Sequence, residues 1–258
     1  MSFVRIAAVH KIYERRGEAV HALAGIDLEA GFGEFLCLLG VSGCGKSSLL
    51  QILAGHEHAT SGGVFVEGKP LDGPHPKAAQ VVQDHGLFPW MTVERNVGFN
   101  LRARRTKSAE IAAIVRRMIE TVGLQGFEKR YPHELSGGMR QRVGIARAFT
   151  TNPHLLLMDE PFGALDAQTR SLMQAELLRI WRAHRATVFF VTHSVEEAVY
   201  LADRIVVMTP RPGRVRAIIP VELSRPRDPT SPCFIRYVRQ VLGEIHDDVL
   251  NLLRERQA

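Results

Sequence analysis

The segment from Gly40 to Ser47 restricts the fold of this chain more than any other part of its sequence. It matches the pattern G-x-x-x-x-G-K-[ST], and it follows an apolar run (residues 35–39) and precedes a helical run (residues 48–54). Glycines at these spacings let backbone N–H groups converge on phosphate, and the start of a helix adds partial positive charge. The segment therefore predicts a phosphate-binding loop between a buried strand and a helix.

Two side chains of this loop carry its chemistry. Lys46 is expected to reach the β- and γ-phosphates of a nucleotide, and the hydroxyl of Ser47 is expected to bind Mg²⁺. We interpret Cys44 as a small filler of the loop rather than as a reactive thiol. The predicted nucleotide-binding residues of the segment are Gly40, Val41, Ser42, Gly43, Cys44, Gly45, Lys46, Ser47 and Ser48.

A second apolar strand ends in two carboxylates. Residues 155–158 are all apolar, and Asp159 and Glu160 follow them directly. Asp159 at the strand tip is suited to hold Mg²⁺, and Glu160, pointing the other way by strand alternation, is suited to act as general base on an attacking water. An Asp-Glu pair can also begin a helix, but a phosphate loop in the same chain favours the catalytic interpretation.

A third segment, Ser136-Gly137-Gly138, precedes a predicted helix over residues 139–149. Ser136 would be the N-cap of that helix, whose N-terminus would be a second place to bind an anion. By itself the pattern fits an ordinary helix cap equally well. One nucleotide does not need two helix starts from the same chain, so the ligand of this second helix start is an open question.

The order of predicted elements indicates an α/β fold. Strands and helices alternate, which favours a largely parallel sheet with helices on both faces. We expect one domain over residues 1–258, in which residues 1–91 and 152–223 form the nucleotide-binding core. Residues 92–151 would be an inserted helical subdomain, and residues 224–258 a helical tail.

Composition excludes several other classes of protein. Disordered and coiled-coil compositions do not fit, and the sequence has no apolar run of the roughly 18–20 residues that a membrane-spanning helix needs. The three cysteines form no disulfide or metal framework, and the N-terminus does not look like a signal peptide, so we expect a protein of the cytosol. The net charge of +6 would permit a nucleic-acid or a membrane-surface partner. Residues 101–130 hold eight basic and three acidic side chains, which we interpret as a solvated helix face.

In their order along the chain, these motifs resemble those of the ATP-binding subunits of ABC transporters. The resemblance covers nearly the whole chain and runs through the phosphate loop, Gln83, residues 135–141, residues 155–160, residues 163–166 and His193. It implies a P-loop NTPase (RecA-like) core with an N-terminal antiparallel β region and an inserted α-helical subdomain. It also implies a head-to-tail dimer, in which the Ser136 turn faces the γ-phosphate held by the partner subunit.

The resemblance also assigns roles to single residues. Tyr13 would stack on adenine, although it would also fit as an ordinary strand aromatic. Asp166 would cross the dimer interface, and Val41 and Ser48 depart from the family's frequent Pro and Thr without removing a ligand. The implied sets are catalytic Glu160, His193 and Gln83; Mg²⁺ ligands Ser47, Gln83 and Asp159; and, facing the partner's ATP, Leu135, Ser136, Gly137, Gly138 and Gln141.

Two observations indicate which kind of ABC protein this is: several features of other ABC classes do not occur in the sequence, and four short stretches resemble one importer branch. Long coiled coils, a second cassette, fused membrane spans and a regulatory β-domain are all absent, which favours an importer subunit. Residues 86–93, 124–131, 211–215 and 223–227 resemble the nitrate/sulfonate/taurine branch. We therefore expect ATP-driven import of a small anionic solute, with taurine or an aliphatic sulfonate favoured and nitrate next. A soluble, non-transport ATPase, such as one assisting iron–sulfur assembly, is the alternative.

The resemblance implies partners as well. We expect a second ATPase subunit, two membrane permease subunits and, indirectly, an extracytoplasmic solute-binding protein, with no nucleic acid. The chain would lie peripherally on the cytoplasmic side of the inner membrane. The segment Phe88-Pro89-Trp90 is expected to help form a groove for a permease helix, with core packing of Phe88 and Trp90 as the alternative.

Overall fold

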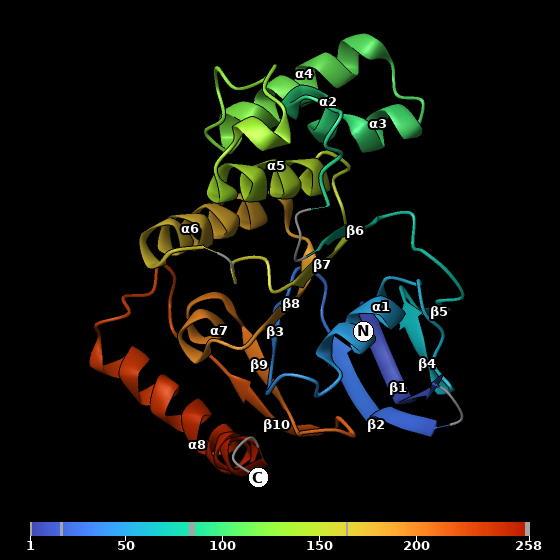
Figure 1. Ribbon diagram of the computed structural model, residues 1–258, viewed down its shortest axis with the longest axis vertical. Helices are drawn as coiled ribbons and strands as arrows, with labels where there is room; N and C mark the ends of the chain where they lie inside the picture. Colours follow the sequence, from blue (N-terminus) through green and yellow to red (C-terminus); the bar gives the residue numbers. More distant parts are fainter. Residues whose placement is uncertain (1, 16–17, 83–85, 164, 256–258) are drawn as a thin grey trace. The chain divides into compact units, whose positions relative to one another are not determined.

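The computed structural model describes residues 2–15, 18–82, 86–163 and 165–255 (Figure 1). Two compact units can be distinguished. The phosphate-loop unit consists of Met1–His75 and Thr187–Ala258, and the helical unit consists of Pro76–Ala186. None of the helices in the described part of the chain is long and apolar enough to cross a membrane.

The phosphate-loop unit begins with an antiparallel sheet, as expected. Its first strands are β1 (Val4–Arg15) and β2 (Glu18–Ala30). The alternation of side chains along β1 is interrupted at Ala8, where φ is 45° and the register of β1 with β2 shifts. The strand order is β2-β1-β4-β5, with β4 at Ser61–Val66 and β5 at Lys69–Pro70.

The second sheet of this unit is centred on β3 (Phe35–Leu39). β3 runs parallel to both β8 (Thr187–Thr192) and β9 (Arg204–Met208), and β10 (Val215–Pro220) is antiparallel to β9. Every residue of β3 and β8 is buried, as is typical of parallel strands covered on both faces. The helices of the unit are α1 (Lys46–Leu53), α7 (Val195–Leu201), which packs on β3 and β8, and α8 (Pro232–Glu255), which packs on α7.

In the helical unit, β6 (Ala78–Val81) pairs in parallel with β7 (Leu155–Asp159). β6 was not predicted, because Ala-Ala-Gln-Val has little of the β-branched and aromatic content that marks a strand. α2, α4 and α6 pack on α5. The helices are α2 (Val93–Val97), α3 (Phe99–Ala103), α4 (Ser108–Thr121), α5 (Gly137–Phe149), α6 (Ala167–His184) and the short 3₁₀ helix η1 (Pro132–Glu134).

Candidate nucleotide-binding site

The predicted phosphate loop joins β3 to α1, as the sequence indicated. Gly43 and Gly45 have φ angles of 80° and 97°, a left-handed backbone conformation that glycine adopts at low cost. A Cβ atom on Gly45 would lie 2.6 Å from a methyl carbon of Leu23, so only glycine fits there. The first turn of α1 has no acidic residue, and the loop therefore leads into a helix start suited to an anion.

Lys46 is buried, with 5% of its surface exposed. Its ammonium nitrogen donates hydrogen bonds to the carbonyl oxygens of Gly40, at 2.7 Å, and Val41, at 3.0 Å, and lies 3.6 Å from the sulfur of Cys44. Cys44 itself is fully buried. The backbone of the loop thus surrounds the positive charge of Lys46, and such an arrangement is suited to bind a polyphosphate.

The turn between β9 and β10 supports the back of the loop. Gly213 donates its N–H to the carbonyl of Ala22, and its own carbonyl accepts from the N–H of Ala24. A Cβ atom on Gly213 would lie 2.0 Å from the carbonyl oxygen of Cys44. In the sequence, residues 211–215 were noted only for their resemblance to one branch of the family. The structure shows that this turn must end in glycine because it touches the phosphate loop.

His193 lies at the same sheet edge as the start of the loop. Leu39 is paired with Thr192 in the parallel register of β3 and β8, so Gly40 and His193 each follow the end of one of two neighbouring strands. Ligands of open α/β sheets bind at this edge. The side chain of His193 is exposed.

The residues on either side of His193 are held by a small hydrogen-bond network. The hydroxyl of Thr192 donates to the carboxylate of Glu197, which is buried, and accepts from the N–H of Ser194 at 3.0 Å. The hydroxyl of Ser194 accepts from the N–H of Glu197 at 3.2 Å. That Thr192 and Glu197 support the site was not predicted from the sequence. Their spacing across the start of a helix was the one feature of the sequence that could have indicated the hydrogen bond between them.

Asp159 and Glu160 belong to the helical unit. Asp159 is the last residue of β7, as predicted, and both side chains are half-buried. Glu160 has a φ angle of 44°, which is uncommon for a residue other than glycine. Strand alternation therefore stops at Asp159 and does not set the direction of Glu160, contrary to our expectation. Val81 of β6 is paired with Met158, and Gln83, a little further on, lies outside the described residues.

The turn at Ser136 caps α5. Its hydroxyl accepts from the N–H of Met139 at 3.3 Å, and the helix begins at Gly137, two residues earlier than predicted. Ser136 is exposed, whereas Leu135 and Gln141 are buried. A Cβ atom on Gly138 would lie 2.7 Å from the methyl group of Thr169 on α6, so glycine permits this close packing.

The remaining predicted site residues lie in separate places. In the helical unit, Asp166 is exposed and caps α6, where the N–H of Thr169 donates to its carboxylate at 3.0 Å and lowers its pKa. In the phosphate-loop unit, the ring of Tyr13 on β1 faces the ammonium of Lys11 at 4.7 Å, and Lys11 is paired with Glu57. The phosphate loop, Tyr13 and His193 thus share one unit, and Ser136, Asp159, Glu160 and Asp166 share the other.

The sequence model of the ABC transporter family matches residues 23–163, a segment that includes the phosphate loop, the Ser136 turn and the strand ending in Asp159. The chain is 43% identical over 241 residues to the aliphatic sulfonates import ATP-binding protein SsuB of Bacillus cereus, covering 93% of this chain and 95% of that protein. It is 48% identical over 217 residues to the taurine import ATP-binding protein TauB of Burkholderia pseudomallei, covering 84% of each.

Among solved structures, the chain resembles a dimeric ATP-binding cassette in a post-hydrolysis state with bound ADP and Pi. The TM-score is 0.76 and the identity 28%, covering 86% of this chain and all of that one. This likeness confirms the predicted P-loop NTPase core, and the relatives come from the predicted branch. The chain belongs to the ABC transporter family, as one of its ATP-binding, ATP-hydrolysing subunits.

Proposed function

We propose that this chain hydrolyses ATP to energise import of a small anionic solute, with taurine or an aliphatic sulfonate favoured and nitrate next. The observation that carries the proposal is the 43–48% identity to two import proteins, one named for aliphatic sulfonates and one for taurine, over most of each chain. The alternative of a soluble, non-transport ATPase is not favoured by these relatives.

The nucleotide would be held by the phosphate loop. The left-handed glycines of that loop and the buried ammonium of Lys46 support this assignment. Ser47, Gln83 and Asp159 would hold Mg²⁺, which when bound would neutralise phosphate charge. Glu160 would take the proton of the attacking water, His193 would contact the γ-phosphate, and Tyr13 would stack on adenine.

The chain would act as a head-to-tail dimer with a second ATPase subunit, like the solved cassette described as dimeric. The helix starts of α1 and α5 support this, since neither has an acidic residue in its first turn and both are suited to an anion. Ser136 to Gly138 would contact the γ-phosphate held by the partner's loop, and Asp166 would cross the interface. Each nucleotide would then lie between two helix starts, that of α1 in one subunit and that of α5 in the other.

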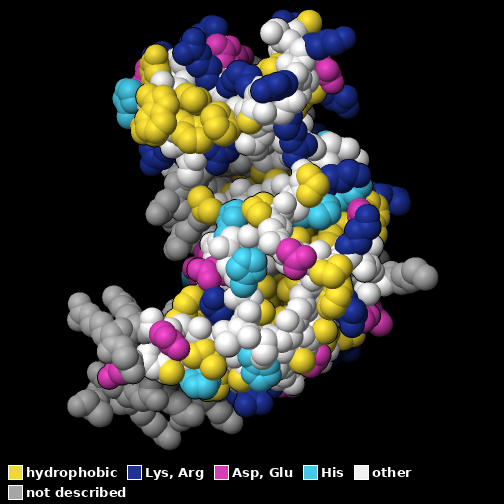
Figure 2. Space-filling view, turned by 90° about the vertical axis from the view of Figure 1, so that its right-hand side faces the viewer, with side chains coloured by type: hydrophobic (Ala, Val, Ile, Leu, Met, Phe, Trp, Pro, Cys, Tyr) yellow, Lys and Arg dark blue, Asp and Glu magenta, His cyan; other side chains and the backbone are white. Residues whose placement is uncertain are grey.

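The permease subunits would contact the helical unit near Trp90. This side chain is 68% exposed, whereas Phe88 packs on Phe99 with ring centres 4.4 Å apart. The fully buried side chain of Asn96 fixes the segment, since it accepts from the N–H of Phe88 at 2.8 Å and donates to the carbonyl of Met91 at 2.9 Å. Hydrophobic side chains also gather on the surface of this unit in Figure 2. The exposed ones among its described large residues are Trp90, Phe127, Tyr131 and Leu172.

Such a rigid, exposed aromatic segment is suited to receive a cytoplasmic helix of a permease. The chain would then lie peripherally on the cytoplasmic side of the inner membrane, bound to two permease subunits, and the solute-binding protein would act on the opposite side.

Reconstitution tests the proposal. The chain, its permease subunits and the solute-binding protein would be placed in liposomes, and ATP-dependent uptake of taurine, an alkanesulfonate and nitrate would be compared. We expect uptake of a sulfonate. Uptake of nitrate alone would overturn the favoured substrate, and ATP hydrolysis without uptake of any of the three would overturn the assignment as an importer of this class.

A further inference from the structure

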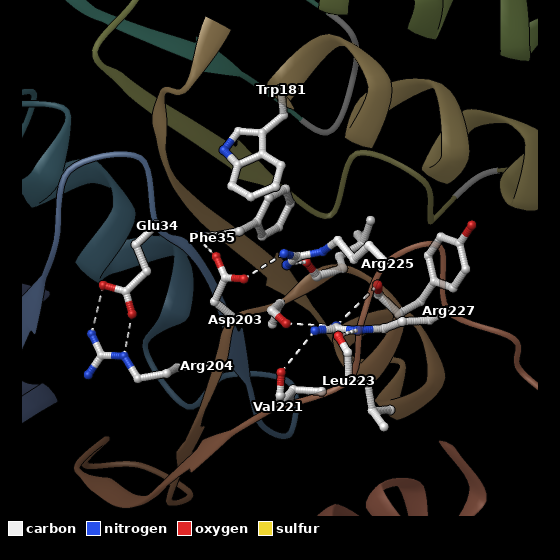
Figure 3. Close-up of polar contacts among 12 residues, drawn as sticks. Glu34, Phe35, Trp181, Asp203, Arg204, Val221, Leu223, Arg225 and Arg227 are labelled. Atoms are coloured by element: carbon white, nitrogen blue, oxygen red, sulfur yellow. Dashed lines mark hydrogen bonds and ion pairs between the residues drawn. The ribbon is translucent and has the colours of Figure 1, made fainter. Parts of the chain in front are cut away.

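The segment that follows β10 sends two arginine side chains toward the C-terminal end of α7 (Figure 3). Arg227 is only 5% exposed. One of its terminal nitrogens donates to the carbonyl oxygens of Val199 at 2.6 Å, Ala202 at 2.7 Å and Tyr200 at 3.2 Å. Its other nitrogens donate to carbonyls of its own segment, at residues 221 and 223.

Arg225 completes the arrangement. It donates to the carbonyl of Leu201 and forms an ion pair with Asp203, at 2.6 Å. The other carboxylate oxygen of Asp203 accepts from the N–H of Phe35, the first residue of β3. The carbonyls of residues 199–202 are therefore all bound by the two arginines.

These carbonyls need such partners. The last carbonyls of a helix have no intrahelical partner and carry partial negative charge, so a cation at that end is stabilising. Burial, and then the nearby charge of Arg225, lower the pKa of Arg227 to about 10. The guanidinium is nevertheless held at this position, because five backbone carbonyl oxygens accept its hydrogen bonds. Lysine has three donors and no planar fork, so it could replace only part of this set.

His193 lies just before the opposite end of α7, next to the N-cap residue Ser194. α7 has seven residues, which corresponds to a length of about 10 Å. The helix begins directly after Ser194, and the buried Glu197 of its first turn accepts from Thr192, the residue before His193. A short helix held at both ends passes a change at its C-terminal end to its N-terminal end, because its backbone is rigid over two turns.

We propose that Arg227, supported by Arg225, is a positioning residue that holds α7 and, through it, places His193 for ATP hydrolysis. This inference rests on the role of His193 proposed above. The segment Leu223 to Arg227 would then have a role in the catalytic cycle, whereas in the sequence it indicated only a branch of the family.

Arg204 offers a matched control. It lies beside Asp203, and its described hydrogen bonds go to the carboxylate of Glu34 and the carbonyl of Glu29 rather than to α7 (Figure 3). Both arginines bridge segments far apart in the sequence. Loss of Arg204 should therefore affect stability without displacing His193.

The experiment compares Arg227→Met, Arg227→Lys, Arg204→Met and His193→Ala in the full chain. Thermal unfolding would give the Tm of each variant, and the nucleotide Kd and the kcat and KM for ATP would then be measured well below the lowest Tm. For Arg227→Met we expect kcat to fall about tenfold or more, since small displacements of a catalytic group are costly, with Kd and KM within about twofold. Arg227→Lys should recover part of kcat, and Arg204→Met should lower Tm with kcat nearly unchanged.

Equal turnover of folded Arg227→Met and Arg204→Met would overturn the inference. If Arg227→Met does not fold, Arg227→Lys and Arg225→Met take its place, and each must lower kcat without changing nucleotide Kd. His193→Ala distinguishes failure of the proposed role of His193 from failure of the positioning role of Arg227. Normal turnover of that variant would remove the proposed role of His193, whereas its inactivity beside a fully active Arg227→Met would remove only the positioning role.

Discussion

Leu39 of β3 is in register with Thr192 of β8, and each is followed directly by a residue of the proposed site, Gly40 and His193. Both strands are buried along their whole length, so a slip of one strand against the other would break buried main-chain hydrogen bonds. The relative position of the phosphate loop and His193 is thus built into the hydrophobic core of the phosphate-loop unit.

Replacing Gly213 by alanine should disturb the phosphate loop from behind. The new Cβ would lie 2.0 Å from the carbonyl oxygen of Cys44, so the loop or the turn must move. We expect a loss of about 1–3 kcal/mol in the free energy of unfolding and weaker nucleotide binding. Gly243→Ala in α8 is the control, since nothing lies within 4 Å of its Cβ and helix propensity favours alanine by about 0.5–1 kcal/mol. Denaturant unfolding measures the free energy of unfolding, and nucleotide titration measures the affinity. If Gly213→Ala and Gly243→Ala have the same stability and the same affinity, the prediction is contradicted.

Glu160→Gln should bind ATP but hydrolyse it very slowly. Glutamine keeps the size of the side chain and cannot accept the proton of the attacking water, so turnover should fall about 10²–10⁴-fold. Nucleotide-dependent dimers should accumulate, which size-exclusion chromatography with and without ATP would detect. Glu176→Gln, on the exposed pair with Arg179, is the control. Unchanged turnover of Glu160→Gln would exclude Glu160 as the base.

Trp90→Ala should separate permease coupling from stability. Because the indole is 68% exposed, its removal should change the free energy of unfolding by no more than about 0.5 kcal/mol. We expect normal ATP hydrolysis by the isolated chain, with loss of permease binding and of uptake in liposomes. Phe32→Ala, another exposed aromatic but in the phosphate-loop unit, should keep both. Intact permease binding by Trp90→Ala would contradict the docking surface.

The stability of the chain should depend on pH through His184. Burial, and then the nearby charge of Arg117, lower the pKa of His184 below its ordinary value. The unfolded chain therefore takes up the proton first as pH falls, and the contribution of His184 is complete above about pH 6.5 and lost as pH falls through its folded-state pKa. His184→Gln should lose less stability between about pH 7.5 and pH 5.5 than the unchanged chain. Urea unfolding at both pH values measures this, and an identical loss would contradict it.

The chemistry of the site could be predicted from short stretches of sequence. The phosphate loop, the strand ending in Asp159 and the cap at Ser136 each consist of neighbouring residues, so local geometry and residue type define them. The strands β3 and β7 were found for the same reason, because continuous apolar runs of this length mark buried strands.

Tertiary structure alone decided how these pieces are supported. Gly213 lies against Cys44, and Arg225 and Arg227 together bind the carbonyls of residues 199–202, because β9 lies next to β3 and brings distant segments together. The strands β3, β8 and β9 have similar apolar sequences, and such runs do not specify which strand lies beside which. Side-chain chemistry is therefore local information in this protein, whereas the placement of that chemistry depends on strand order, which only packing of the whole sheet determines.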